Sequence, residues 1–135
     1  MRRVVVDASV LAAITFGEPD SEEWSQRLDG CALYAPTLLQ YELASGARKK
    51  CRQRPDLTRQ ILLATDLALD RRRGITSMDP NPVDVVLIAN ATGLSTYDAS
   101  YLWLAGYLEA DLVTRDRALS VALDPSAGTG DRCEA

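Results

Sequence analysis

The segment VVVDASVL, residues 4–11, joins three consecutive valines to an aspartate and decides the fold of this 135-residue chain. An unbroken run of β-branched residues is typical of a strand that is buried on both faces, as in a parallel sheet. Asp7 follows directly, at the carboxyl end of the strand, where α/β sheets keep their functional sites. A carboxylate buried there must be paired, hydrogen-bonded or metal-bound. The structural alternative is that Asp7 caps the following helix.

The rest of the chain alternates between strand and helix patterns. We expect strands at residues 3–7, 32–35, 75–78 and 111–114, and helices at 9–16, 21–29, 36–50, 55–73, 83–92, 98–108 and 117–123. Pro36 suits the first turn of a helix, and Gly93 suits a helix C-cap. This order predicts an α/β fold with a short central parallel sheet and helices on both faces. Residues 1–123 form the single domain, and we expect residues 124–135 to be a loosely ordered tail.

The absence of histidine is the most restrictive fact of the composition. It removes the usual general base, the Ser-His and Cys-His pairs and a common zinc ligand. An enzyme built from this chain must therefore work with carboxylates and metal. Three cysteines without metal-ligand spacing read as incidental thiols of a reducing compartment, and no segment reads as a signal peptide or membrane span. These features predict a cytoplasmic protein with no membrane partner.

Three further acids share with Asp7 a position where a strand or helix can deliver them inward. They are Glu42, Asp98 and Asp116. Each has a structural alternative, because Asp98 and Asp116 could cap helices and Glu42 could be a solvated helix residue. Together at one sheet edge, the carboxylates would repel one another unless a cation held them. Since every candidate ligand is a hard oxygen, the sequence favours Mg²⁺ or Mn²⁺.

Small polar residues accompany these acids. Ser9, two residues after Asp7, could cap the first helix or bind a metal-bound water, and Thr114 places a hydroxyl two residues before Asp116. In the helix of Glu42, the residues expected to face the core are Leu39, Leu43 and Ala47. Gly46 lies one turn from Glu42, and we interpret it as room for the close approach of a ligand.

The net charge is -4, but the basic residues are concentrated in two clusters. Arg48, Lys49, Lys50, Arg52 and Arg54 form the first cluster, and Arg71, Arg72 and Arg73 form the second. They have two possible explanations. Both could be solvated helix ends, where cations favour the helix dipole, or they could bind nucleic-acid phosphates. We assign Arg48, Lys49 and Lys50 as the candidate RNA-binding residues.

Four ordered segments resemble the motifs of PIN-domain nucleases. They are VVDASVL at 5–11, Ala35-Pro36 with Glu42-Leu43, LSTYDASYLWLA at 94–105, and LVTRDRAL at 112–119. Domains of this length in the family are mostly VapC-type toxins of toxin-antitoxin pairs. The resemblance implies a PIN-like three-layer fold, with Asp7, Glu42, Asp98 and Asp116 as catalytic, metal-binding acids and Thr114 as their accompanying hydroxyl.

The resemblance also implies an activity and partners. It implies a metal-dependent endoribonuclease directed at single-stranded RNA, a homodimer, and a cognate antitoxin that blocks the site. The family commonly closes with a strand after the last helix, for which residues 124–135 give no signal. Two alternatives remain, a PIN fold that has lost catalysis and serves as an RNA-binding or scaffold subunit, and a Mg²⁺-dependent phosphotransfer domain. Ser9 stands where the related phosphatases need a second aspartate, which counts against the latter.

Overall fold

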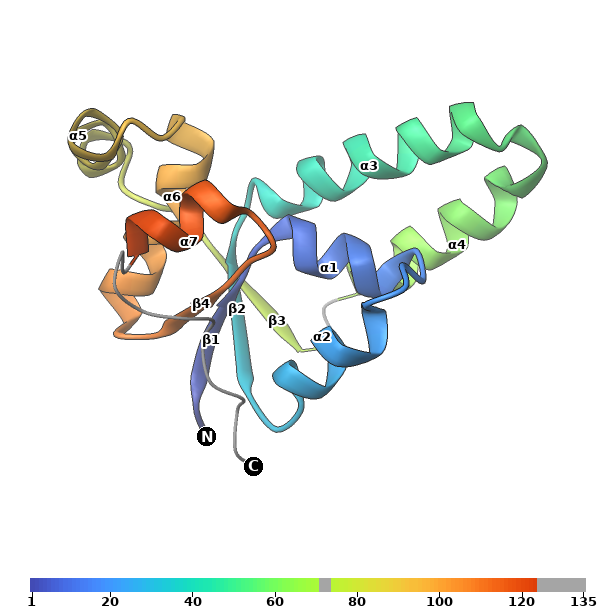
Figure 1. Cartoon of the computed structure of the whole chain (residues 1–135), viewed down its shortest axis with the longest axis horizontal. Helices are drawn as coiled ribbons and strands as arrows, with labels where there is room; N and C mark the ends of the chain where they lie inside the picture. Colours follow the sequence, from blue (N-terminus) through green and yellow to red (C-terminus); the bar gives the residue numbers. More distant parts are fainter. Residues whose placement is uncertain (71–73, 124–135) are drawn as a thin grey trace.

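The structure is a computed structural model that describes residues 1–70 and 74–123. Its centre is a four-stranded sheet in the order β3-β2-β1-β4 (Figure 1), in which every pair of neighbours is parallel. The strands are β1 (Arg3–Val6), β2 (Ala32–Pro36), β3 (Ile75–Met78) and β4 (Asp111–Val113). Val4, Val5 and Val6 of β1 have exposed fractions of 0%. The opening valine run is therefore the inner strand that its sequence predicts.

Helices surround this sheet. They are α1 (Ala8–Thr15), α2 (Ser21–Leu28), α3 (Leu39–Gln53), α4 (Thr58–Ala68), α5 (Pro82–Thr92), α6 (Thr96–Leu108) and α7 (Arg117–Leu123), with a 3-10 turn η1 (Pro55–Leu57) before α4. Figure 1 shows α1 and α2 on one side of the sheet and α5 and α6 on the other, while α3 and α4 project together beyond it. The predicted α/β architecture with helices on both faces is confirmed.

The core joins the sheet to one face of each major helix. Tyr101 and Leu104 of α6, Leu43 of α3 and Leu119 of α7 are fully buried, as is Val10 of α1. The predicted core stripe of α3 is confirmed, because Leu39, Leu43 and Ala47 are all buried. Burial of these apolar side chains is the main favourable contribution to folding. It also fixes the start of α3 close to the carboxyl ends of β1 and β2.

The predicted helix start at Pro36 is wrong. Pro36 is the last residue of β2, where it pairs with Met78, and the amide of Thr37 donates to the Met78 carbonyl at 3.2 Å. Helix α3 begins only at Leu39. Proline suits the first turn of a helix and also the end of a strand, where the loss of one amide donor is tolerated. Its local preference therefore could not choose between the two positions.

Two other helix boundaries differ from prediction. Helix α4 ends at Ala68, well before Gly74, and among its apolar side chains Ile61 is buried whereas Leu67 is 51% exposed. Helix α6 begins at Thr96 and not at Asp98. The helix predicted at 83–92 is confirmed as α5, which Asn81 caps at its start and Gly93 ends in the left-handed conformation at φ 78°. The Arg71–Arg73 cluster and the tail at 124–135 lie outside the described residues.

Cysteine usage departs from the expectation of three incidental thiols. Cys51 carries a free thiol, but Cys31 takes part in a disulfide bond. The expectation is therefore wrong for Cys31. Among the helices of the described ranges, none combines the length and the apolar character needed to cross a bilayer.

Candidate active site at the carboxyl edge of the sheet

Asp7 is the buried acid of the sheet edge, with an exposed fraction of 5%. The hydroxyls of Ser9 and Thr114 each donate a hydrogen bond of 2.7 Å to the same carboxylate oxygen, Oδ2. Each hydroxyl is itself held by a backbone amide, because Arg115 donates to Ser9 Oγ at 3.1 Å and Asp116 donates to Thr114 Oγ1 at 2.9 Å. The segment after β4 therefore supports the acid that follows β1. Ser9 and Thr114, the two hydroxyl residues that accompany the acids in the sequence, thus both contact Asp7.

The alternative that Asp7 is simply a helix cap is not supported. Its carboxylate makes no capping hydrogen bond within the described ranges, although its backbone carbonyl accepts from Val10 and Leu11 as α1 begins. Two hydroxyl donors offset part of the free-energy cost of burying this charge. The carboxylate is thus held by the sheet edge and not by its own helix.

Asp116 and Asp98 differ in whether they cap a helix. Asp116 does cap α7, because its Oδ1 accepts from the amide of Leu119 at 3.1 Å. Asp98 does not cap α6, since the cap is Ser95, whose Oγ accepts from the amide of Asp98 at 3.1 Å. Asp98 instead lies within the first turn of α6. Its carboxylate is therefore available for a purpose other than starting the helix.

Glu42 projects from the first turn of α3 and contacts α6 through a tyrosine. The hydroxyl of Tyr101 donates to Glu42 Oε1 at 2.6 Å, and the side chain of Tyr101 is fully buried. Burial raises the pKa of Glu42, the Tyr101 hydrogen bond opposes that rise, and the charges of Asp7 and Asp98 add to it. Burial and Glu42 together raise the pKa of Tyr101 far above its ordinary range, so its phenol stays neutral.

Neighbouring acids also affect the pKa of Asp98. Burial raises the pKa of its carboxyl, Asp116 and then Asp7 raise it further, and the hydrogen bond from Ser95 acts in the opposite direction. Asp98 is thus coupled to Asp7 and Asp116, as Glu42 is to Asp7 and Asp98. Coulomb coupling of this kind requires short separations. The fold therefore brings all four predicted acids, from four separate segments, into one electrostatic neighbourhood.

The donor set fits a hard divalent cation by its chemistry, since it consists of carboxylate oxygens with hydroxyls beside them. Within residues 1–70 and 74–123, however, no three acidic or cysteine side chains are gathered closely enough to form a metal cluster. The four acids therefore interact electrostatically, but their side chains are not gathered into a set of metal ligands.

Two other sequence interpretations change on the structure. A Cβ added at Gly46 would meet the side chain of Phe16, the residue after α1, at 3.8 Å, an ordinary contact, so Gly46 is not required for close packing. Lys50, predicted to bind RNA, forms an ion pair with Glu18 at 2.9 Å. Arg48 and Lys49 are exposed. The interpretation of Gly46 as ligand space is therefore not supported, and Lys50 already has an acidic partner.

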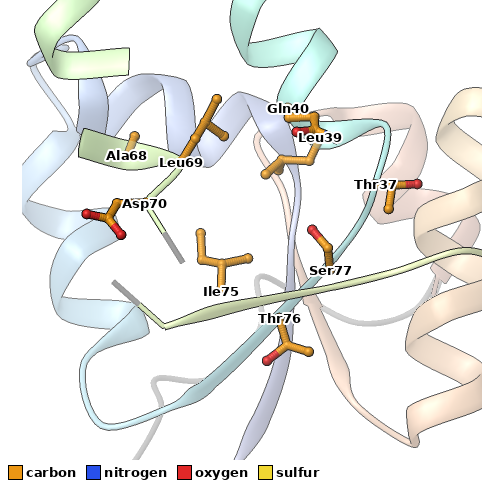
Figure 2. A pocket seen from close by; sticks show the side chains of 9 residues that line it. All are labelled: Thr37, Leu39, Gln40, Ala68, Leu69, Asp70, Ile75, Thr76 and Ser77. Atoms are coloured by element: carbon orange, nitrogen blue, oxygen red, sulfur yellow. The ribbon is translucent and has the colours of Figure 1, made fainter. Parts of the chain in front are cut away.

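A cavity of about 450 Å³ lies beside β3 (Figure 2). The apolar part of its wall consists of Leu39, Leu69 and Ile75, and its polar groups include Thr37 and Ser77. None of the four acids is among the described residues that line this cavity. It therefore does not belong to the acidic site.

The role of Tyr101 was not predicted from sequence. A signal was present, because a tyrosine on a buried helix face must find a partner for its hydroxyl. The identity of that partner could not be read locally, since Glu42 lies 59 residues away.

The fold and the site define a class of protein. It is an α/β domain without histidine that carries acids at the carboxyl edge of its parallel sheet. The model of the PIN domain family matches residues 4–122, most of the chain, and the chain belongs to this family. PIN domains are generally metal-dependent nucleases, so at this coarse level the fold is of nuclease type and the class is hydrolase.

A solved structure agrees with this assignment. The crystal structure of PAE2754 from Pyrobaculum aerophilum is similar with a TM-score of 0.71 and 25% sequence identity, over 93% of this chain and 90% of that chain. The comparison with curated proteins finds no significant match.

Proposed function

We propose that this protein is a Mg²⁺- or Mn²⁺-dependent endoribonuclease that cleaves single-stranded or loop RNA, and that it acts as the toxin of a toxin-antitoxin pair. The observation that carries the enzymatic part is the coupling of four carboxylates at one sheet edge in a chain without histidine. Acidic side chains with a purely structural role normally pair with a cationic side chain or cap a helix. Here burial first, and neighbouring carboxylates in addition, raise the pKa values of Glu42 and Asp98, which is an unfavourable arrangement unless a cation uses it.

In this proposal Asp7, Asp98 and Asp116 hold the cation, and Glu42 completes the site. When bound, a divalent cation supplies positive charge to the scissile phosphate and helps a water molecule to lose its proton. Ser9 and Thr114 both donate to Oδ2 of Asp7, and Oδ1 takes no part in those two bonds. Glu42 has a raised pKa, which makes its carboxylate a stronger base for the proton of the attacking water.

RNA binding is the next part of the proposal. Affinity for phosphate chains comes largely from Lys and Arg, and the acidic site itself repels phosphate. Arg48 and Lys49 lie on exposed positions of α3, the helix that also carries Glu42. We assign these two residues to the phosphates that flank the cleaved bond. Lys50 contributes less because it is paired with Glu18.

The biological setting follows from the family resemblance of the motifs. A cytoplasmic homodimer held inactive by a cognate antitoxin protein is the arrangement that we propose. Exposed apolar side chains on α4 and α5 leave surface for such contacts. They are Leu62, Leu63, Leu67, Val83, Val86 and Leu87.

Cleavage of a single-stranded RNA in the presence of Mg²⁺ or Mn²⁺ tests the enzymatic part. We expect metal-dependent cleavage by the native protein, no cleavage after chelation, and loss of cleavage in Asp98→Asn. Asp66→Asn, an exposed acid of α4, is the matched control and should cleave as the native protein does. If the native protein neither cleaves RNA nor gains thermal stability at millimolar Mn²⁺, the enzymatic proposal is wrong and a scaffold role takes its place.

A further inference from the structure

We infer that Tyr101 is a positioning residue of the acidic site, which orients Glu42 of α3 from helix α6. The inference rests on the proposed function, because it gives Tyr101 a part in preparing the site for its cation. It is carried by a hydrogen bond between two helices whose bonded residues are 59 positions apart in sequence.

The first step is the bond between the two side chains. Tyr101 has an exposed fraction of 0%, and its hydroxyl oxygen lies 2.6 Å from Oε1 of Glu42. A buried hydroxyl without a partner destabilises the folded state, so a residue needed only for packing would be better as phenylalanine. The hydroxyl therefore has a use that the ring alone cannot supply.

The second step is the direction of the bond. The phenol of Tyr101 is the donor, and Oε1 of Glu42 is the acceptor. An ionised carboxylate can only accept hydrogen bonds, so the Tyr101 hydroxyl suits the charged form of Glu42.

The third step is the connection to the other acids. Tyr101 lies three residues after Asp98 on α6, which places both on one side of that helix. The hydrogen bond of Tyr101 therefore joins Glu42 of α3 to the helix that carries Asp98.

A consequence for Glu42 is that one oxygen is occupied. Oε1 accepts from Tyr101, whereas Oε2 takes no part in that bond. The carboxylate is held in one orientation with Oε2 left to face the cation or its water. Loss of the Tyr101 hydroxyl would free the carboxylate to rotate without changing its charge.

The test compares Tyr101→Phe with Tyr97→Phe, a control on the same helix whose side chain is 65% exposed. Mn²⁺ affinity is measured by thermal-shift titration, and kcat and KM are measured on single-stranded RNA. We expect Tyr101→Phe to weaken Mn²⁺ binding by about tenfold and to lower kcat by a similar factor, since partners of metal-binding side chains have effects of this size. KM should be unchanged, and Tyr97→Phe should match the native protein in all three quantities.

A double-mutant cycle with Glu42→Ala shows whether Tyr101 acts through Glu42. We expect Tyr101→Phe to have no further effect on Mn²⁺ affinity when residue 42 is alanine. An equal loss in both backgrounds, or no loss in the native background, would overturn the inference. Should Tyr101→Phe not fold, the native protein still decides. Its Tyr101 hydroxyl proton should appear as a slowly exchanging signal in the NMR spectrum that Glu42→Ala removes, and a native spectrum without that signal counts against the bond.

The inference and the proposed function can fail separately. If the native protein binds no Mn²⁺ and cleaves no RNA, the proposed function is wrong. The same cycle is then read in metal-free unfolding free energy, where coupling between residues 101 and 42 supports the positioning bond and its absence overturns it.

Discussion

The hydroxyl of Thr114 donates to Oδ2 of Asp7 across 107 residues of sequence, and the amide of Asp116 donates to that same hydroxyl. We predict that Thr114→Val, which keeps the shape of the side chain, will lower the free energy of unfolding by about 1–3 kcal/mol, because it leaves a buried carboxylate and an amide each short of a partner. Urea unfolding monitored by circular dichroism measures this. The exposed strand residue Thr76 provides the control, and Thr76→Val should change stability by less than about 0.5 kcal/mol.

Removal of one acid should separate activity from stability. Asp98→Asn is expected to reduce metal-dependent RNA cleavage at least ~100-fold, because even indirect support of a metal is worth about 10–100-fold. Without metal, the same variant should unfold at a slightly higher temperature, since Asp98 no longer repels Asp7 and Asp116. Cleavage assays and metal-free thermal unfolding measure the two effects. Undiminished cleavage would remove Asp98 from the site.

The metal-free protein should lose stability as the pH rises through the raised carboxyl pKa values. The ordinary values are 4.5 for Glu42 and 3.8 for Asp98, and both are raised in the folded state. The folded state therefore holds these protons more tightly than the unfolded state, so their contribution is fully present below the ordinary values and is lost as pH increases through the folded values. In Asp98→Asn this loss should be smaller, because one raised group is gone and Glu42 has lost a charged neighbour.

Urea unfolding in EDTA at a series of pH values from about 4 to about 7 measures that difference. Comparison of the native protein with Asp98→Asn cancels groups that titrate equally in both, including Glu18, whose pKa is lowered by Lys50. Parallel stability curves for the two proteins would show that Asp98 does not carry the raised pKa.

Gly46 offers a prediction of the opposite sign. Because an added Cβ would meet Phe16 at an ordinary 3.8 Å, Gly46→Ala should raise the free energy of unfolding by up to ~1 kcal/mol and leave RNA cleavage unchanged. Gly93→Ala is the contrasting control, since its φ of 78° strains any L side chain and the substitution should destabilise. A loss of cleavage in Gly46→Ala would restore the interpretation that this glycine makes room for a ligand.

The basic residues of α3 should differ in their effect on RNA affinity. Charge reversal at Arg48 and Lys49 is expected to weaken binding and to reduce the salt dependence of log affinity by roughly 0.7 for each phosphate that the protein no longer neutralises. Lys50→Gln should have little effect on RNA binding, because Lys50 is paired with Glu18. Binding isotherms at several salt concentrations, recorded in calcium or EDTA to prevent cleavage, measure both. An unchanged salt slope in the Arg48→Glu, Lys49→Glu variant would remove this surface from the RNA path.

The sequence predicts features that depend on neighbours in the chain. The valine run before Asp7 is a buried strand by its own composition, and Asn81 and Gly93 mark the ends of α5 by their capping preferences. The start of α6 is predicted at the wrong residue because Ser95 and Asp98 can both cap a helix. A serine three residues before an acid is itself a helix-start pattern, and it favours Ser95.

Features that depend on distant partners are less accessible. The carboxyl edge of a parallel sheet indicates that Asp7 and Asp116 lie near each other, because strand ends gather there. No local pattern shows that Tyr101 bonds to Glu42 or that Lys50 pairs with Glu18, since those contacts depend on how helices pack across the sheet. The four acids could therefore be chosen from sequence, but the residues that hold them in place could be only partly identified.

The pairing of β1 with β4 joins the first strand of the chain to the last one described, with Val6 opposite Val113. During synthesis, Asp7 emerges long before Thr114 and Asp116, and at roughly 5–20 residues per second the interval is on the order of 10 s. A growing chain therefore holds its first acid without the hydroxyl that orients it. For the ribonuclease that we propose, this order of synthesis leaves the acidic site incomplete until nearly the whole domain has been translated.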